Sequence, residues 1–153
     1  MEIKMKLMVA VDFSDPTDKI LRVTKQLAKN LDAFVWVVHA AEPDPDFVGY
    51  DAGPEVVRGQ VAKELRDEHR QLQKYADELR EAGVDAKAML VRGPTVKALL
   101  EMAGKQGADM IIVGSHGRGM VADILLGSVS QGLIKSARCP VTVVPASSSD
   151  PTS

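Results

Sequence analysis

The residues best suited to do chemistry lie in a glycine-rich segment in the second half of the chain. It runs from Gly114-Ser115-His116-Gly117-Arg118-Gly119 to Gly127-Ser128-Val129-Ser130. Glycine lets backbone approach a ligand closely, and the N–H groups at a helix start, at the positive end of its dipole, bind anions without a lysine. We therefore expect Gly127, Ser128 and Val129 to present successive amides to phosphate oxygens, with the hydroxyl of Ser128 or Ser130 as a further donor. Plain turn chemistry after a buried strand is the alternative.

Two common nucleotide fingerprints do not explain this segment. The chain contains no G-x-x-x-x-G-K-[S/T] sequence, which excludes a P-loop with its phosphate-binding lysine. Gly117, Gly119 and Ala122 match the loose dinucleotide pattern, but they follow the fourth expected strand instead of the first. No acidic residue lies about 20 positions further on, where a dinucleotide fold places its ribose ligand. We therefore discard the dinucleotide interpretation.

Short apolar runs and amphipathic stretches alternate along the whole chain. Continuous apolar or β-branched runs predict strands buried on both faces, and apolar residues at helical spacing predict helices. The expected strands span residues 7–11, 33–40, 84–91, 109–113 and 140–144. The expected helices span residues 16–31 and 55–82, then a stretch that begins at Pro94 and ends at Gly104 and Gly107, and lastly residues 124–137.

This alternation predicts a single α/β domain with an open parallel sheet and helices on both faces. The domain is expected to cover residues 1–146, with a proline-rich mobile loop at 42–54 and a disordered tail at 147–153. Ligands of such sheets collect outside the carboxyl ends of the strands. Asp12, Ala40 and the segment after Val113 are therefore the places where we expect a site. Asp12 is also suited to cap the next helix, which is its structural alternative.

Composition limits the partners. The chain of 153 residues has 19 Lys and Arg against 21 Asp and Glu, with no block of like charge, which argues against electrostatic binding of nucleic acid or an anionic membrane. Its longest apolar run, residues 33–41, is far shorter than the ~20 residues that cross a bilayer. Cys139 is the only cysteine, so an internal disulfide is impossible, and a packing role is expected for it. These features predict a cytoplasmic protein.

One motif matches a known family. Gly114, Gly117, Gly127 and Ser128 fill the pattern Gly, two residues, Gly, nine residues, Gly-Ser or Gly-Thr. In this the chain resembles the ATP-binding branch of the universal stress protein family, and the likeness extends to residues 9–12 with Ser14, His39, 107–109, 113–117 and 139–141. The resemblance implies an adenine nucleotide alpha hydrolase-like sheet of five strands in the order 3-2-1-4-5, with a switch point between strands one and four.

The resemblance also implies roles for single residues. Asp12 would lie against the adenosine, Val113 would line the nucleotide, and the main chain of Ala40 would read the adenine edge. The family often has valine at position 40, so the apolar wall would be thinner here. The ribose and phosphates would be surrounded by Gly114, Gly117, Gly127, Ser128 and Val129. Arg118 would contact phosphate or remain a surface side chain.

The function implied is that of a cytosolic stress-response or regulatory protein that binds ATP, with Mg²⁺ or Mn²⁺ held mainly through the phosphates. It would form a homodimer through the last strand and act on an unidentified protein partner. The alternative is a slow ATP hydrolase or phosphotransferase that uses the same pocket, for which His116, Arg118 and Asp12 are the only candidates. A third possibility is a partner-binding protein whose pocket holds another adenosine compound or stays empty. No catalytic residue is assigned.

Overall fold

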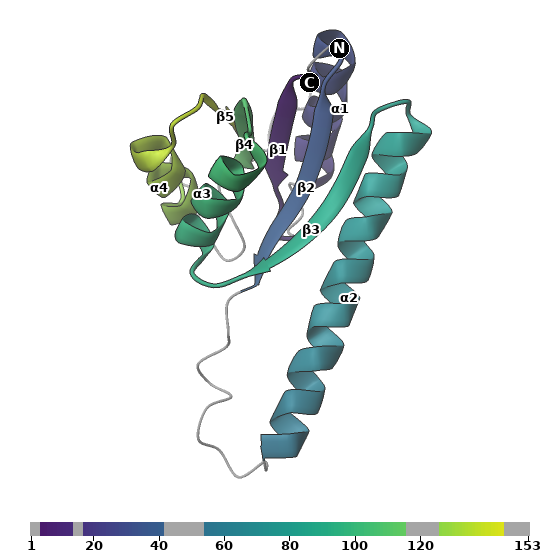
Figure 1. Cartoon of the computed structure of the whole chain (residues 1–153), viewed down its shortest axis with the longest axis vertical. Helices are drawn as coiled ribbons and strands as arrows, with labels where there is room; N and C mark the ends of the chain where they lie inside the picture. Colours follow the sequence, from purple (N-terminus) through teal and green to yellow (C-terminus); the bar gives the residue numbers. More distant parts are fainter. Residues whose placement is uncertain (1–3, 14–16, 42–53, 116–125, 146–153) are drawn as a thin grey trace.

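The computed structural model describes residues 4–13, 17–41, 54–115 and 126–145, and only the backbone of residues 54–58. Strands and helices alternate along these residues (Figure 1). The strands are β1 (Lys6–Ala10), β2 (Phe34–Ala41), β3 (Ala86–Arg92), β4 (Met110–Gly114) and β5 (Val141–Val144). The helices are α1 (Thr17–Leu31), α2 (Pro54–Glu81), α3 (Thr95–Gln106) and α4 (Ser128–Ser136).

The five strands form one parallel sheet in the order β3-β2-β1-β4-β5, as predicted. β1 lies at its centre, where Val9 is in register with Val37 of β2 and with Ile112 of β4. Helices α1 and α2 lie on one side of the sheet and α3 and α4 on the other (Figure 1). β1 is therefore covered on both faces, which is why its sequence is apolar without polar alternation.

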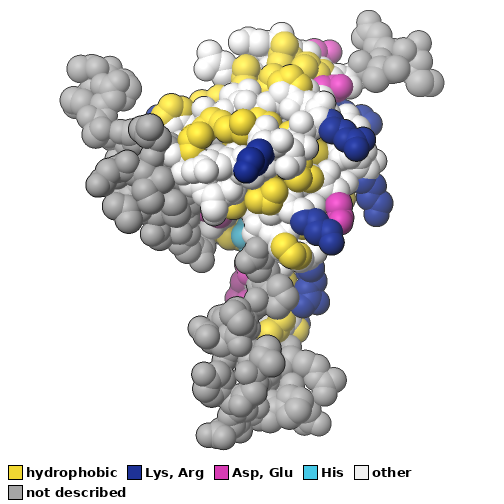
Figure 2. Space-filling model, turned by 90° about the vertical axis from the view of Figure 1, so that its left-hand side faces the viewer, with side chains coloured by type: hydrophobic (Ala, Val, Ile, Leu, Met, Phe, Trp, Pro, Cys, Tyr) yellow, Lys and Arg dark blue, Asp and Glu magenta, His cyan; other side chains and the backbone are white. Residues whose placement is uncertain are grey.

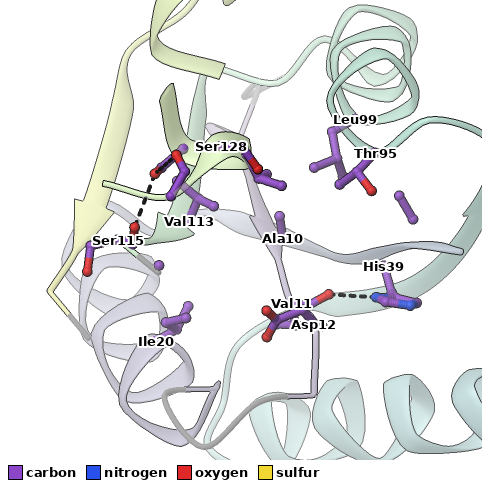
Figure 3. Close-up of a pocket in the computed structure, with 15 residues that line it drawn as sticks. Ala10, Val11, Asp12, Ile20, His39, Thr95, Leu99, Val113, Ser115 and Ser128 are labelled. Carbon is purple, nitrogen blue, oxygen red and sulfur yellow. Dashed lines mark hydrogen bonds between the residues drawn. The ribbon is translucent and has the colours of Figure 1, made fainter. Parts of the chain in front are cut away.

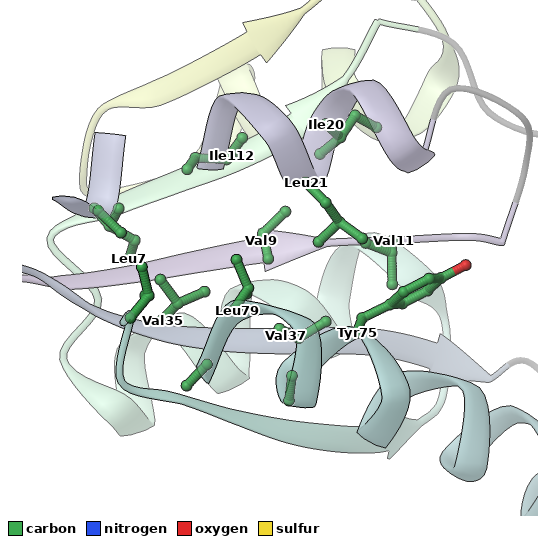
Figure 4. Packing of buried hydrophobic residues seen from close by; sticks show 14 of the residues in the cluster. Leu7, Val9, Val11, Ile20, Leu21, Val35, Val37, Tyr75, Leu79 and Ile112 are labelled. Atoms are coloured by element: carbon green, nitrogen blue, oxygen red, sulfur yellow. The ribbon is translucent and has the colours of Figure 1, made fainter. Parts of the chain in front are cut away.

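Side chains of β1 divide between two buried clusters because successive strand residues point to opposite faces. On the first face, Leu7 and Val9 pack with Leu21 of α1 and Leu79 of α2 (Figure 4). On the second, Met8 and Ala10 pack against buried side chains of α3 and α4: Ala98, Leu99, Met102, Ala103 and Leu133. The two clusters thereby hold β1 and the helices that bear the candidate site in fixed relative positions.

Two helix ends differ from the prediction. The last helix begins at Ser128 instead of residue 124, because Gly127 is extended (φ −77°, ψ 171°) and its N–H donates to the carbonyl of Ser115 over 2.6 Å. Residues 124 and 125 lie outside the described ranges. In α3, Gly104 lies inside the helix, and only Gly107, in a left-handed conformation (φ 64°), ends it.

Some predictions concern residues that the structure does not describe. They are residues 42–53 of the loop expected at 42–54 and the tail at 147–153. The last residue of the expected loop, Pro54, is instead the first residue of α2. Among the helices that are described, none is long and apolar enough to span a bilayer.

Candidate functional site

A cavity lies at the carboxyl ends of β1 and β4, between the two halves of the sheet (Figure 3). The chain leaves β1 toward β2 on one side, whereas β4 lies on the other side of β1. Crevices at such switch points are the usual ligand sites of open α/β sheets. Its lining comes from β1 and the residues after it, α1, β2, α3, β4 and α4: Ala10, Val11, Asp12, Ile20, His39, Ala40, Thr95, Leu99, Val113, Gly114, Ser115, Gly127, Ser128, Val129 and Ser130.

One wall of the cavity is apolar and built from buried side chains. Ala10, Ala40, Leu99 and Val113 are each less than one tenth exposed, and they belong to the cluster between the sheet and α3 and α4. Figure 3 shows Ala10, Leu99 and Val113 around the same space. This wall suits a flat apolar surface such as a nucleobase, because binding removes apolar area from water on both partners.

The opposite end of the cavity is formed by the first turn of α4. The first hydrogen bond within the helix joins the N–H of Gln131 to the carbonyl of Gly127 over 3.0 Å. The amides that come before it in the helix are those of Ser128, Val129 and Ser130. Residue 127 is glycine and has no side chain with which to cap them. These N–H groups and the helix dipole make this end suitable for a phosphate group.

The two serines of this turn have different roles. Ser130 is buried, and its hydroxyl donates to the carbonyls of Gly127 (3.0 Å) and Ser115 (3.2 Å). The single proton of this hydroxyl is therefore shared between two main-chain acceptors, one of which, Ser115, follows the end of β4. Ser128 is exposed at the cavity, so of the two hydroxyls expected to donate, Ser128 is the one positioned to do so.

The described lining contains two ionisable side chains, those of Asp12 and His39. Neither lysine nor arginine occurs among these lining residues. The imidazole of His39 is held on both sides, with Nδ1 2.8 Å from the carbonyl oxygen of Val11 and Nε2 2.6 Å from Oε2 of Glu68 on α2. An anion at this site would therefore be bound by main-chain dipoles more than by positively charged side chains.

Eight of the ten residues expected to bind nucleotide lie around this cavity: Asp12, Ala40, Val113, Gly114, Gly127, Ser128, Val129 and Ser130. Gly117 and Arg118 fall outside the described ranges, as does His116. The sequence analysis missed Ile20, Thr95 and Leu99, which line the cavity from α1 and α3. The signal for Ile20 and Leu99 was the apolar stripe of a helix, which does not distinguish a cavity wall from core, and Thr95 gave no signal.

Cys139 has no part in the cavity. It is half-buried before β5 and packs against the cluster between the sheet and α3 and α4. Burial raises the pKa of its thiol, and the Asp109 carboxylate raises that pKa further. The protonated thiol is a weak nucleophile, so the packing role expected for this residue agrees with its surroundings.

Comparisons with known proteins agree with this geometry. Residues 5–145 match the model of the universal stress protein family. A universal stress protein of Thermus aquaticus is 33% identical over 141 residues, which are 90% of this chain and 96% of that protein. The structure of MJ0577 from Methanocaldococcus jannaschii superposes with a TM-score of 0.80 at 26% identity, covering 94% of this chain and 97% of that one.

A third relative carries a ligand. The universal stress protein of Archaeoglobus fulgidus in complex with dAMP has a TM-score of 0.62 and 27% identity to this chain. The match covers 93% of this chain and 98% of that one.

Proposed function

Because this chain belongs to the universal stress protein family, we propose that the cavity at the ends of β1 and β4 binds an adenine nucleotide. The ligand is ATP, with Mg²⁺ or Mn²⁺, and the protein acts in the cytoplasm as a stress-linked sensor or regulator. The observation that carries the proposal is the first turn of α4, whose amides face a cavity that has an apolar wall. A relative of known structure binds dAMP, which supports the choice of base.

The base is assigned to the end of the cavity near Ala40. Pairing between β2 and β1 ends where Ala10 is in register with Val38, but β2 continues to pair with β3 as far as Ala41. At Ala40, the main chain of β2 on the side that faces β1 therefore lies beyond the last residue pair of the two strands. Main chain at this edge can read the polar edge of adenine, while Leu99 and Val113 pack on the ring.

The ribose and phosphates then run toward α4. Asp12 lines the cavity between the two ends and is suited to accept hydrogen bonds from ribose hydroxyls. Among the described residues, no three carboxylate, histidine or cysteine side chains form a metal-binding group. Mg²⁺ commonly keeps several waters and is bound through one or two carboxylates plus substrate phosphates. We therefore assign the divalent ion to the phosphates, with Asp12 as the nearest candidate carboxylate.

Binding without efficient hydrolysis is the function that this lining favours. Phosphoryl transfer requires groups that stabilise charge in the transition state more than in the ground state. Helix amides stabilise phosphate in both states, and the described lining offers neither lysine nor arginine as a clamp. No observation on these residues favours the hydrolase alternative, so it is not proposed.

Millimolar MgATP is expected to raise the melting temperature of the protein by roughly 5–10 °C. A ligand at about 100 times its dissociation constant adds about 2.7 kcal/mol to the free energy of unfolding. Each kcal/mol shifts the melting temperature of a chain of this size by about 2–4 °C. Differential scanning fluorimetry measures the melting temperature, and calorimetric titration measures the dissociation constant. ADP, AMP and GTP are tested in the same way for comparison. If no adenine nucleotide shifts the melting temperature and none gives binding heat, the proposal is contradicted.

We further propose that two copies of the chain associate through β5. This strand lies at the edge of the sheet and pairs only with β4 in the described sheet. Its residues Val141, Thr142 and Val143 remain half-buried. An apolar edge strand presents unpaired main-chain groups to any second strand. Light scattering at tens of micromolar is expected to give the mass of a dimer, and a monomer mass under these conditions would contradict the assignment.

A further inference from the structure

His39 joins α2 to the end of β1, next to the cavity (Figure 3). Its side chain is only 15% exposed and that of Glu68 29%, so water competes little for the contact between them. Nε2 lies 2.6 Å from Oε2 of Glu68, which is close enough for a direct hydrogen bond. The pair connects a helix that lies outside the nucleotide site to a strand that forms it.

Both partners of the imidazole accept hydrogen bonds. A main-chain carbonyl and an ionised carboxylate can only accept, so each ring nitrogen must carry a proton for both bonds to form. The bridge is therefore complete only when His39 is an imidazolium. A neutral ring can donate to Val11 or to Glu68, but not to both.

The charged groups around His39 in the described structure are negative. A second hollow adjoins the nucleotide cavity, and the charged groups that line it with His39 are all carboxylates: Asp12 from the end of β1 and Glu64, Asp67 and Glu68 from α2. Three further neighbours among the described residues are uncharged. They are the Phe13 ring at 4.5 Å, Leu90 in register on β3 and Thr95 on α3.

The bridge acts on the residues that lead into Asp12. Val11 is held through both main-chain groups, since its N–H donates to the carbonyl of Val38 (2.9 Å) and its carbonyl accepts from His39. Phe13, just beyond Asp12, is a non-glycine residue with a left-handed φ of 62°. Such a conformation is strained for a residue other than glycine and persists only where its surroundings hold it. The turn that presents Asp12 is thus strained and tied down on one side by His39.

We propose that His39 and Glu68 are positioning residues for nucleotide binding: the protonated histidine, bridged to Glu68, holds Val11 and so the orientation of Asp12 toward the ligand. The inference rests on the proposed function. It predicts tighter binding at pH 6 than at pH 8, because a ring that has lost its second proton leaves one of the two hydrogen bonds unmade.

Two variants separate the parts of the bridge. His39→Asn places an amide near the position of Nδ1, which keeps a donor for Val11 but does not reach Glu68. Glu68→Gln removes the charge and keeps the shape, and its amide can accept from an N–H or donate to a bare nitrogen, so the bridge no longer needs the second proton. His69→Asn is the matched control. His69 follows Glu68 in α2, its side chain is exposed, and it contacts Gln73.

Cyclic AMP is the probe for the pH series, with MgATP as the second ligand. A phosphate monoester changes charge near pH 6, whereas the phosphodiester of cyclic AMP stays singly charged across the range. Dissociation constants are measured by calorimetric titration at pH 6, 7 and 8. A melting curve of each variant at each pH checks that it is folded.

Wild type and His69→Asn are expected to bind about fivefold or more tightly at pH 6 than at pH 8, a coupling of ordinary size. His39→Asn should bind about fivefold more weakly than wild type at pH 6 and show no slope. Glu68→Gln should lose the slope but keep much of its affinity at pH 8. If folded variants match wild type in affinity and slope, the positioning role is overturned while the proposed function stands. A wild type that binds neither nucleotide at any pH overturns both.

Discussion

Gly127→Val is expected to abolish nucleotide binding while the protein still folds. The extended backbone of Gly127 (φ −77°, ψ 171°) is one that valine adopts without strain. Its side chain, however, would enter the space where a phosphate meets the amides of Ser128 and Val129. Each hydrogen bond to a charged group contributes about 1.5–3 kcal/mol, so the loss of two raises the dissociation constant by roughly a hundredfold or more. Calorimetric titration with MgATP measures this loss.

The control for this variant is Gly104→Ala. Gly104 lies within α3, and a Cβ there has no atom within 4 Å. Gly132, in the body of α4, is unsuitable as a control, because an added Cβ would lie 2.8 Å from Cγ2 of Val96. That contact would disturb the packing of α4 on α3, so Gly132→Ala is not neutral. Equal affinity of Gly127→Val and Gly104→Ala would show that the glycine motif serves the fold and not the ligand.

Leu133→Ala is expected to have the largest effect on stability among substitutions in the helix that bears the phosphate end. Leu133 is fully buried in the cluster between the sheet and α3 and α4. Truncation of a buried leucine costs about 2–5 kcal/mol, because apolar contacts are lost and a cavity remains. The melting temperature should fall by about 4–20 °C. Chemical denaturation gives the free energy, and the slope of the transition shows whether unfolding remains two-state.

Ile134→Ala is the matched control for this experiment. Ile134 is the next residue of α4 and is 49% exposed, so its truncation should change the free energy of unfolding by less than about 0.5 kcal/mol. If Leu133→Ala were as stable as Ile134→Ala, α4 would not be anchored through Leu133. The rigid placement of its first turn at the cavity would then need another explanation.

The fold could be predicted because its signals are local. Runs such as residues 7–11 are short and apolar throughout, which is typical of a strand covered on both faces. Alternation with amphipathic helices then leaves a parallel sheet as the simplest arrangement, and the family resemblance supplied the strand order that the structure shows. Strand ends shifted by one or two residues, because the last residues of a strand are decided by pairing with a neighbour.

The start of α4 shows where local signals fail. Residues 124–126 are apolar and at helical spacing with those that follow, so propensity alone extends the helix over them. The helix begins at Ser128 because the N–H of Gly127 bonds to Ser115 at the end of β4 and the hydroxyl of Ser130 bonds to the same carbonyl. A contact between two elements therefore decided which amides are left for a ligand.

By itself, the sequence predicted the class of fold, the ends of the strands at which the cavity lies, and the glycine and serine residues of α4 that line it. These follow from hydrophobic period and backbone chemistry, which act between near neighbours in the chain. Only the tertiary structure decided that Thr95 and Leu99 line the cavity and that His39 meets both Val11 and Glu68. The physical reason is that such contacts depend on how the helices pack against the sheet, and that packing is a property of the whole core, which no short segment encodes.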